Sequence, residues 1–432
     1  MPLNAINRIA YIDLQNQLNT ISPHGQDRHL LTHGQFPASG PSQDSPFGRP
    51  DFQFPTWSPD GQHIATIGSD GNNGGLYVVP DNHQSVPLKR LYASESRLPF
   101  YMYWSPDSHM ISFVATDLQG IGLHLVSLES NDYRLLTTGQ PIFWDWMPES
   151  DQILIHSGIN YPEAQLALID LKPEANIGEN IAQPGLFQAP SIAPNGRYWA
   201  YAEMDDYDNG QLVVADIATQ EQIEVPYEGV VAFNWNPAGD RLAFIAPPNP
   251  IRRYYGPLHL LDTARKSVRK LVDETILAFF WSPTGQHLAY FTMADTPPVQ
   301  HTIHRPSYAL NGNGTGNGNG NGVHKNNDLS LSSAADQPYE PDDTLLLDVW
   351  IIDVTNGEKA NIATVRPSSL FVNQFLPFFD QFALSHRIWS PDGTALVMPM
   401  DKDDSTNIFI IPIDGSQPFA IAIGKIAFWS RQ

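Results

Sequence analysis

The stretch Trp389-Ser390-Pro391-Asp392-Gly393 decides the fold of this chain, because variants of it recur along the whole sequence. Pro presets the backbone for the second position of a tight turn, Asp suits the third, and Gly can adopt the left-handed conformation that closes a short hairpin. The motif therefore predicts a hairpin turn. The other copies are Trp57-Ser-Pro-Asp-Gly61, Trp104-Ser-Pro-Asp-Ser108, Trp146-Met-Pro-Glu-Ser150, Ile192-Ala-Pro-Asn-Gly196, Trp235-Asn-Pro-Ala-Gly239, Trp281-Ser-Pro-Thr-Gly285 and the shortened Phe428-Trp429-Ser430.

A strand is expected on each side of this turn. The Trp ends the first strand, and an apolar run such as residues 64–67 or 242–245 forms the second. A third apolar run follows in each interval, as at residues 76–79, and a fourth often comes next, as at residues 133–137. Each repeat is thus predicted to form four antiparallel strands.

The spacing of the motif is typical of propeller blades. Its first residues stand at 57, 104, 146, 192, 235, 281, 389 and 429, which gives spacings of 47, 42, 46, 43, 46, 108 and 40 residues. Most of these match a blade of about 40 to 45 residues. Eight such units predict an all-β protein, an eight-bladed β-propeller, with seven blades as the alternative count.

The two ends of the chain are expected to build one blade together. Residues 8–33 contain three short strands that no motif strand precedes, and residues 425–430 supply that strand at the other end. Pairing of the two ends would close the ring and remove exposed sheet edges. Residues 1–432 are therefore interpreted as a single propeller domain.

Two additions account for the long interval between positions 281 and 389. Residues 294–345 interrupt blade seven, and their Asn- and Gly-rich core predicts a disordered insertion. Residues 366–387 form a loop between blades seven and eight that carries five Phe residues within twelve positions. This Phe-rich loop is expected to be packed, and any helix of the protein is expected within it.

The repeat resembles the TolB-type, WD40-like (PD40) propeller repeat, which also occurs in tricorn protease and in the propeller domains of prolyl-oligopeptidase-like enzymes. The resemblance covers nearly the whole chain, from about residue 9 to residue 429. It implies the fold, because the repeat residues make turns and blade packing rather than chemistry. TolB itself has a signal peptide, an N-terminal α/β domain and six blades, and this sequence shows neither the peptide nor the domain.

Composition excludes several classes of function. The formal net charge of -22 argues against a nucleic-acid partner, because phosphate contacts need a basic surface. The absence of Cys excludes disulfides and thiol chemistry. No apolar stretch approaches the roughly 18 residues needed to span a bilayer. A cytoplasmic monomer without membrane contact is expected, or a periplasmic or secreted one if the start is misassigned.

No motif of catalysis or cofactor binding is recognised. Hydrolase chemistry would need a Gly-x-Ser-x-Gly elbow, and phosphate binding a Gly-x-x-x-x-Gly-Lys loop; neither pentapeptide nor loop occurs. The histidines show no His-x-His or His-Glu-x-x-His spacing that would indicate a metal site. No catalytic residue, metal site or cofactor is predicted.

The candidate site lies where the most elaborate loops are expected. The loops between second and third strands and between successive blades share one face of the disc, opposite the motif turns, and binding residues are often carried on such loops. The arginines of this group could hold an anionic group or a peptide carboxylate. In the alternative interpretation they pair with carboxylates such as Asp380, and the Phe residues cap blade seven. The candidate residues are Arg252, Arg253, Tyr254, Tyr255, Asp380, His386 and Arg387.

Three functions are compatible with this reading. The first is a non-enzymatic scaffold that binds a protein or peptide partner through the loop-rich face. The second is a metal-dependent lyase or hydrolase that acts on a saccharide in the central channel. The third is an accessory propeller subunit of a separately encoded peptidase.

Overall fold

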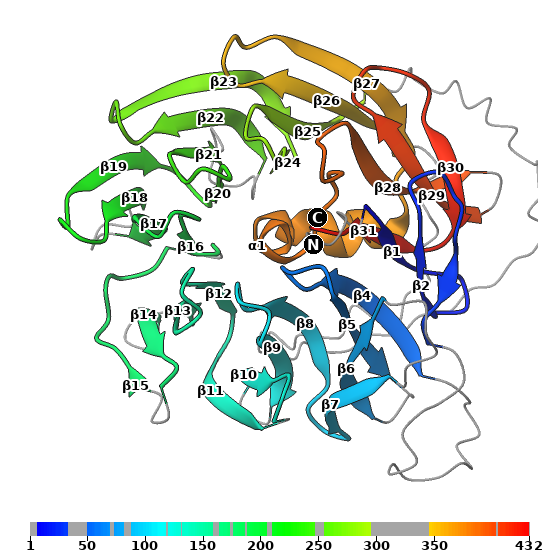
Figure 1. Cartoon of the computed structure of the whole chain (residues 1–432). Helices are drawn as coiled ribbons and strands as arrows, with labels where there is room; N and C mark the ends of the chain where they lie inside the picture. The colour runs from blue at the N-terminus through cyan, green and yellow to red at the C-terminus, as the bar shows by residue number, and fades with distance from the viewer. Residues whose placement is uncertain are drawn as a thin grey trace, which may run out of the picture.

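The computed structural model describes residues 7–32, 50–69, 73–81, 88–117, 120–130, 132–158, 164–172, 176–185, 188–204, 210–246, 255–294, 345–402 and 405–431. In this part the chain forms eight small antiparallel sheets around a common centre (Figure 1). Seven of these sheets have four strands and one has three. The predicted eight-bladed propeller is confirmed, and the alternative count of seven is wrong. Most of the predicted insertion at 294–345 lies outside the described residues.

Blades 2 to 4 follow one another along the chain, each with its strands in sequence order. Blade 2 has β4 (Asp51–Trp57), β5 (His63–Ser69), β6 (Gly74–Pro80) and β7 (Lys89–Ser94). Blade 3 has β8 (Pro99–Trp104), β9 (Met110–Asp117), β10 (Gly120–Ser127) and β11 (Tyr133–Gly139). Blade 4 has β12 (Ile142–Trp146), β13 (Gln152–Ser157), β14 (Gln165–Asp170) and β15 (Asn176–Ile177).

Blades 5 to 7 repeat the same plan. Blade 5 has β16 (Ser191–Ile192), β17 (Tyr198–Met204), β18 (Gly210–Asp216) and β19 (Gln222–Tyr227). Blade 6 has β20 (Ala232–Trp235), β21 (Arg241–Ile245), β22 (Gly256–Asp262) and β23 (Ser267–Ile276). Blade 7 has β24 (Ala278–Trp281), β25 (His287–Met293), β26 (Leu347–Asp353) and β27 (Lys359–Val365).

Blade 1 joins the two ends of the chain, as the sequence predicts. Its strands are β1 (Ile9–Ile12), β2 (Leu18–Ile21), β3 (His29–Leu30) and, at the inner edge, β31 (Ile426–Trp429). Ile9 pairs with Trp429 and Ile12 with Ile426, so the closing strand is antiparallel to β1. All four residues of β31 are buried, and the ring is therefore closed by both hydrogen bonds and apolar packing.

Blade 8 departs from the prediction of four strands per blade. Its sheet contains β28 (Ala395–Lys402), β29 (Ser405–Pro412) and β30 (Phe419–Ile423). The expected innermost strand is reduced to a single bridge between Trp389 and Leu396. The helix α1 (Phe379–Ser385) ends at Ser385, so only residues 386–388 separate it from this bridge and little extended chain remains for an inner strand.

The motif turns are built as the sequence indicates. In blade 2 the Gly61 amide donates to the Ser58 carbonyl (2.9 Å), and Gly61 has a φ of +71°. Hydrogen bonds also join the turns of neighbouring blades. The amide of Asp60 donates to Ser108 Oγ (3.1 Å), and the amide of Asp107 donates to Ser150 Oγ (3.1 Å). We call the side of the disc that carries these turns the turn face and the opposite side the loop face.

The motif Trp side chains link successive blades. The indole N–H of Trp104 donates to the carbonyl oxygen of Thr56 in the preceding blade, at 3.2 Å. Trp235, Trp281 and Trp389 make the equivalent bond, each to the residue just before the motif of the blade before it. Trp146 donates instead to Ser112 Oγ (2.9 Å), which in turn donates to the carbonyl of Tyr103 (2.9 Å).

These hydrogen bonds from the motif Trp side chains are missing at both interfaces of blade 1 in the described structure. The indole nitrogens of Trp57 in blade 2 and Trp429 in blade 1 are buried without a hydrogen-bond partner among the described residues. The two interfaces of the closing blade therefore lack a hydrogen bond that five other blades donate.

A comparison of two Trp-to-Phe variants would measure how much the indole hydrogen bond contributes to the free energy of unfolding. Trp104→Phe removes a donor and leaves a buried carbonyl with one partner fewer, whereas Trp57→Phe removes a buried N–H that has no described acceptor. We expect Trp104→Phe to lower the free energy of unfolding by about 1 kcal/mol more than Trp57→Phe does. Urea unfolding of both variants checks this. Equal losses would mean that the indole bond adds nothing to stability.

Candidate functional site

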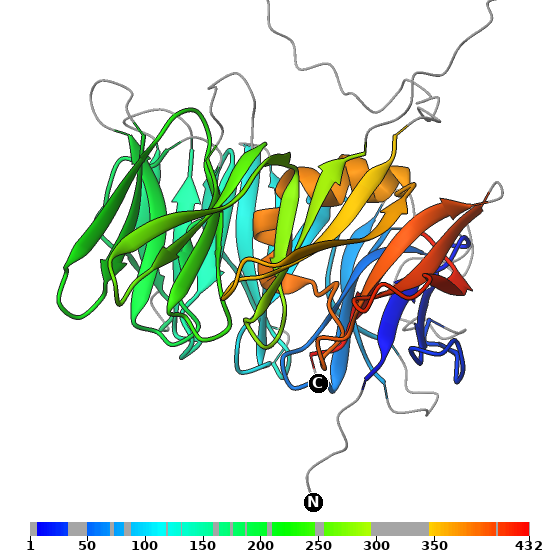
Figure 2. The same cartoon turned by 90° about the horizontal axis from the view of Figure 1, so that it is seen from above.

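A short helical segment fills the centre of the ring. It consists of the π-helix η1 (Phe371–Phe375), the 3-10 helix η2 (Leu376–Phe378) and the α-helix α1 (Phe379–Ser385). We call residues 371–385 the central plug. Figure 1 shows α1 at the centre of the blades, and Figure 2 shows the helical segment nearer one side of the disc, with the C-terminus at the other.

Aromatic side chains hold one side of the plug. Phe375 is fully buried and stacks on Phe280 of blade 7, with ring centroids 5.6 Å apart. Its ring also contacts Phe428 of the closing strand at 5.5 Å. On the far side of the plug Phe382 packs against Phe54 of blade 2 (5.4 Å). The Phe residues thus pack on blade 7, as the alternative interpretation supposes, and also contact blades 1 and 2.

Hydrogen bonds join the other side of the plug to blades 3, 4 and 6. The Tyr101 hydroxyl of blade 3 donates to the carbonyl of Gln381 (2.8 Å), and the Gln381 side chain exchanges two bonds with the backbone of Trp144 in blade 4. Asn234 Nδ2 of blade 6 donates to the carbonyl of Asp380 (3.2 Å). Because these partners are buried backbone groups, the plug is an integral part of the core.

Residues 366–387 connect blades 7 and 8, as in the predicted Phe-rich inter-blade loop, and they include the plug. The sequence indicated packing and some helix there, and both are observed. The location differs, since this segment enters the channel instead of lying on the loop-rich face. Blade 8 therefore lacks a full inner strand. The apolar side chains of the segment pack against the inner edges of the other blades.

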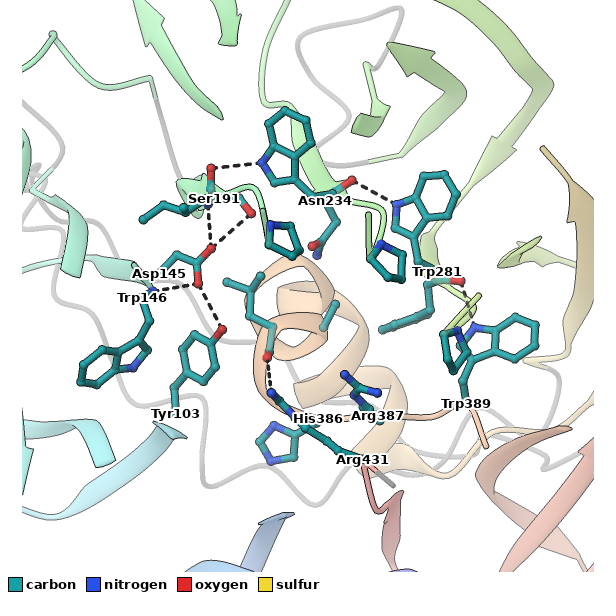
Figure 3. Close-up of a pocket in the computed structure, with 18 of the residues that line it drawn as sticks. Tyr103, Asp145, Trp146, Ser191, Asn234, Trp281, His386, Arg387, Trp389 and Arg431 are labelled. Carbon is teal, nitrogen blue, oxygen red and sulfur yellow. Dashed lines mark hydrogen bonds between the residues drawn. The ribbon is translucent and has the colours of Figure 1, made fainter. Parts of the chain in front are cut away.

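A cavity of about 360 Å³ remains in the channel beside the end of the plug (Figure 3). Its wall includes Ala383 and Leu384 of the plug and the residue just before the motif in six successive blades, from blade 3 to blade 8. Its rim is a collar of five prolines, each from a motif turn, so the cavity lies toward the turn face. These prolines are Pro106, Pro148, Pro194, Pro237 and Pro283.

Two arginines from distant parts of the chain meet in this cavity. Arg387 follows the plug and Arg431 follows the closing strand; the Trp429 amide donates to the Arg387 carbonyl (2.8 Å) and so holds the two segments together. The Arg431 guanidinium donates to the carbonyl of Leu384 (3.0 Å), while its Nε has no hydrogen-bond acceptor among the described residues. Figure 3 shows both guanidinium groups below α1.

Neither guanidinium forms an ion pair with a carboxylate in the described part of the chain. Burial, and after it the charge of Arg431, lower the pKa of Arg387. Burial also lowers the pKa of Arg431, and the nearby Tyr103 and Asp145 offset part of that effect. Two desolvated cations beside each other repel. An anion between them would offset both the loss of solvation and the repulsion.

Asp145 supplies the acidic group of the cavity, but its oxygens are already occupied. They accept hydrogen bonds from the amides of Ile192 and Trp146 (both 2.8 Å), the Tyr103 hydroxyl (3.1 Å) and Ser191 Oγ (3.4 Å). Burial raises the pKa of Asp145 to about 7, against these four donors, which lower it. With two arginines against at most one carboxylate, the cavity keeps a net positive charge.

The candidate residues named from the sequence fall into three groups. Arg252, Arg253 and Tyr254 lie outside the described residues. Tyr255 is exposed just before β22 and is not among the residues that line the cavity. Asp380, His386 and Arg387 share the segment that fills the channel, but they have different surroundings.

Asp380 is buried in the plug, where its carboxylate accepts bonds from the amides of Gln381 (2.9 Å) and Ala189 (3.4 Å). His386 is buried at the edge of the cavity, and its Nδ1 shares a hydrogen bond with Ser385 Oγ (2.6 Å). Arg387 faces the cavity, and the alternative pairing of Arg387 with Asp380 is not observed among the described ion pairs. Of the seven, Arg387 and His386 line the central cavity.

Sequence reasoning missed Arg431, Asp145 and Tyr103. A signal for Arg431 was present, because it stands after Trp429-Ser430, where the other copies of the motif have proline. Since those prolines form the collar of the cavity, a residue that replaces one of them must face the same space. Asp145 and Tyr103 likewise share one repeat position, the residue before the motif Trp.

Among the described residues, no group of three His, Asp or Glu side chains gathers where it could hold a metal ion. Within the same part of the chain, no helix is long and apolar enough to cross a membrane. The fold and site together define a closed propeller with a plugged channel and a cationic central cavity.

No protein-family model matches the sequence, and no curated protein sequence is significantly similar to it. Solved structures do share the fold. A prolyl endopeptidase structure has a TM-score of 0.53 and 11% identity, over 95% of this chain and 58% of that chain. Oligogalacturonate lyase in complex with manganese has a TM-score of 0.50 and 12% identity, over 87% and 85%.

TolB from Acinetobacter baumannii has a TM-score of 0.38 and 15% identity, over 64% of this chain and 66% of that chain. This chain thus spans less than two thirds of the TolB and prolyl endopeptidase chains. The predicted resemblance to TolB-type propellers is confirmed at the level of the fold. At such identities the similarity concerns the fold alone, and the similar structures include both TolB proteins and enzymes.

Proposed function

We propose that this propeller is a non-enzymatic binding protein that holds the C-terminal carboxylate of a peptide or protein partner in its central cavity. The observation that carries the proposal is the meeting of Arg387 and Arg431 in one cavity without an ion-paired carboxylate among the described residues. A guanidinium presents two parallel donors that match the two oxygens of a carboxylate.

The size and lining of the cavity support a chain end as the ligand. At about 360 Å³ it is near the lower limit of ligand pockets, which span roughly 300 to 1,000 Å³. The proline collar is apolar and lines the same cavity as the two arginines, so a carboxylate next to an apolar side chain fits both. These features support the turn face as the entrance, in place of the loop-rich face expected from the sequence.

The charge of the protein indicates the rest of the partner. With a net charge of -22, the surface repels an acidic chain, although the cavity attracts its end. A partner whose last residues are neutral or basic before the terminal carboxylate would satisfy both conditions.

Calorimetry with short peptides tests the proposal. The probe is acetyl-Gly-Gly-Phe with a free carboxylate, and its C-terminal amide is the control ligand. We expect the acid to bind and the amide not to bind. Arg387→Gln should weaken binding of the acid by about 30-fold or more, because one partner of a desolvated charge pair is lost.

The exposed Arg366 precedes the plug on the same segment and provides the matched control. Arg366→Gln should leave the affinity unchanged. Equal binding of acid and amide, or equal affinities of wild type and Arg387→Gln, would refute the assignment. Stronger binding of inorganic phosphate than of the acid would replace a carboxylate by a phosphate ligand.

A further inference from the structure

We infer that an anion bound between Arg387 and Arg431 latches the closing strand β31, so that occupation of the cavity controls how firmly the ring is closed. This inference rests on the proposed function, because it needs an anion in that cavity. It adds that ligand binding is coupled to one particular interface of the propeller.

The first argument is the position of the two arginines. Arg431 is the second residue after β31, whereas Arg387 belongs to the segment that leaves the plug. A ligand that contacts both guanidiniums therefore bridges the last strand of the chain and the centre of the ring. If β31 detaches, Arg431 leaves with it and the site loses half of its charge.

The second argument is electrostatic. The two partly buried cations repel each other near the point where the Trp429 amide donates to the Arg387 carbonyl. The charges that face them from the surrounding elements are few: Asp145 of β12 is the acidic one, with the Tyr103 hydroxyl of β8 and the neutral ring of His386 beside it. A bound carboxylate would turn this repulsion into two attractions.

The third argument is that closure lacks a reinforcement present elsewhere. The indole nitrogens of Trp57 and Trp429, on the two sides of blade 1, have no hydrogen-bond partner among the described residues. The corresponding Trp residues of blades 3, 6, 7 and 8 donate directly to the preceding blade. At the two interfaces of the closing blade, an added interaction would supply a contact that the indole groups do not provide.

Hydrogen exchange tests the latch. Because the ligand binds the closed form, opening of β31 should become rarer by a factor of about 1 + [L]/Kd, where L is the free ligand. With acetyl-Gly-Gly-Phe at roughly 100 times its Kd, we expect exchange of the amides in residues 426–429 to slow about 100-fold. The amides of β18 in blade 5 should slow much less.

Arg431→Gln provides the second measurement, with circular dichroism as the check that it folds. This variant should show no slowing at the same probe concentration. Calorimetric binding of the probe without protection of β31, or equal slowing in every blade, would overturn the latch and leave the proposed function standing. If the probe does not bind at all, the proposed function fails and the latch with it.

Discussion

Replacement of Phe375 by alanine is expected to lower the free energy of unfolding by about 3 to 5 kcal/mol. Phe375 is fully buried at the middle of the central plug, where its ring contacts Phe280, Phe371, Phe382 and Phe428. These four partners cannot follow the shortened side chain, because they are fixed in the plug or in blade strands. The variant would therefore leave a cavity at the junction of blades 1 and 7.

Phe378→Ala is the matched control, three residues along the same plug. The Phe378 side chain is 45% exposed and has no ring contact among the described aromatic pairs. We expect its loss to change the unfolding free energy by less than about 1 kcal/mol. Chemical denaturation of both variants decides the matter, and equal small effects would show that the plug is not part of the core.

The second large effect expected is a gain of stability in Asp380→Asn at alkaline pH. Burial raises the pKa of Asp380 from the ordinary carboxyl value of 3.8 to about 6 in the folded protein. A raised pKa means that the carboxyl group contributes most to stability below about pH 4 and loses that contribution as the pH rises through 6. At pH 8 the wild type buries an ionised group that the variant lacks.

Asn keeps the oxygen that accepts from the Gln381 amide and loses at most the long bond from Ala189. A shift of two pKa units corresponds to about 3 kcal/mol, which sets the upper limit of the gain at pH 8. We expect the gain to shrink steadily between pH 7 and pH 4. Denaturation curves at several pH values measure it, and a gain that is independent of pH would contradict the explanation by charge.

Asp216→Asn serves as the control of opposite sign. The Arg197 guanidinium bonds the Asp216 carboxylate at 2.8 Å and lowers its pKa to about 2. A lowered pKa contributes stability above the usual carboxyl pKa and loses it as the pH falls through 2. This variant should be less stable than the wild type at pH 7, and the difference should disappear toward pH 2.

The plug distinguishes this propeller from a ring with an open central channel. Its helix bonds to the inner edges of blades 3, 4 and 6, and its aromatic side chains contact blades 1, 2 and 7. The plug therefore fills much of the channel, and the cavity of the proposed site lies beside its end, next to prolines of the motif turns. The position of the proposed site is a consequence of the same fifteen residues.

The repeated motif made most of the fold predictable. Each copy encodes its own hairpin turn through residues that are close in the sequence, as the φ of +71° at both Gly61 and Gly393 illustrates. The spacing of the copies gave the number of blades, and the missing strand at residues 8–33 gave the closure by β31. Local turn chemistry and regular spacing are properties that a single sequence displays directly.

The candidate site was harder to predict from the sequence, because its residues come together only in the closed ring. Arg387 was recognised as a candidate, but its partner Arg431 lies 44 positions further along the chain and was overlooked. Asp145 and Tyr103 come from blades on the other side of the channel. No local pattern connects these positions, although the substitution of Arg431 for the motif proline could have indicated it.

The sequence by itself determined the turns, the strands, the eight blades and the pairing of the two ends, since each depends on local conformation or on regular repetition. The tertiary structure alone decided where the Phe-rich segment goes. Five Phe residues demand burial, but their sequence does not specify against which surface. The closed ring offers the inner edges of its blades as that surface, and by filling most of the channel the segment leaves a cavity in which two distant arginines meet.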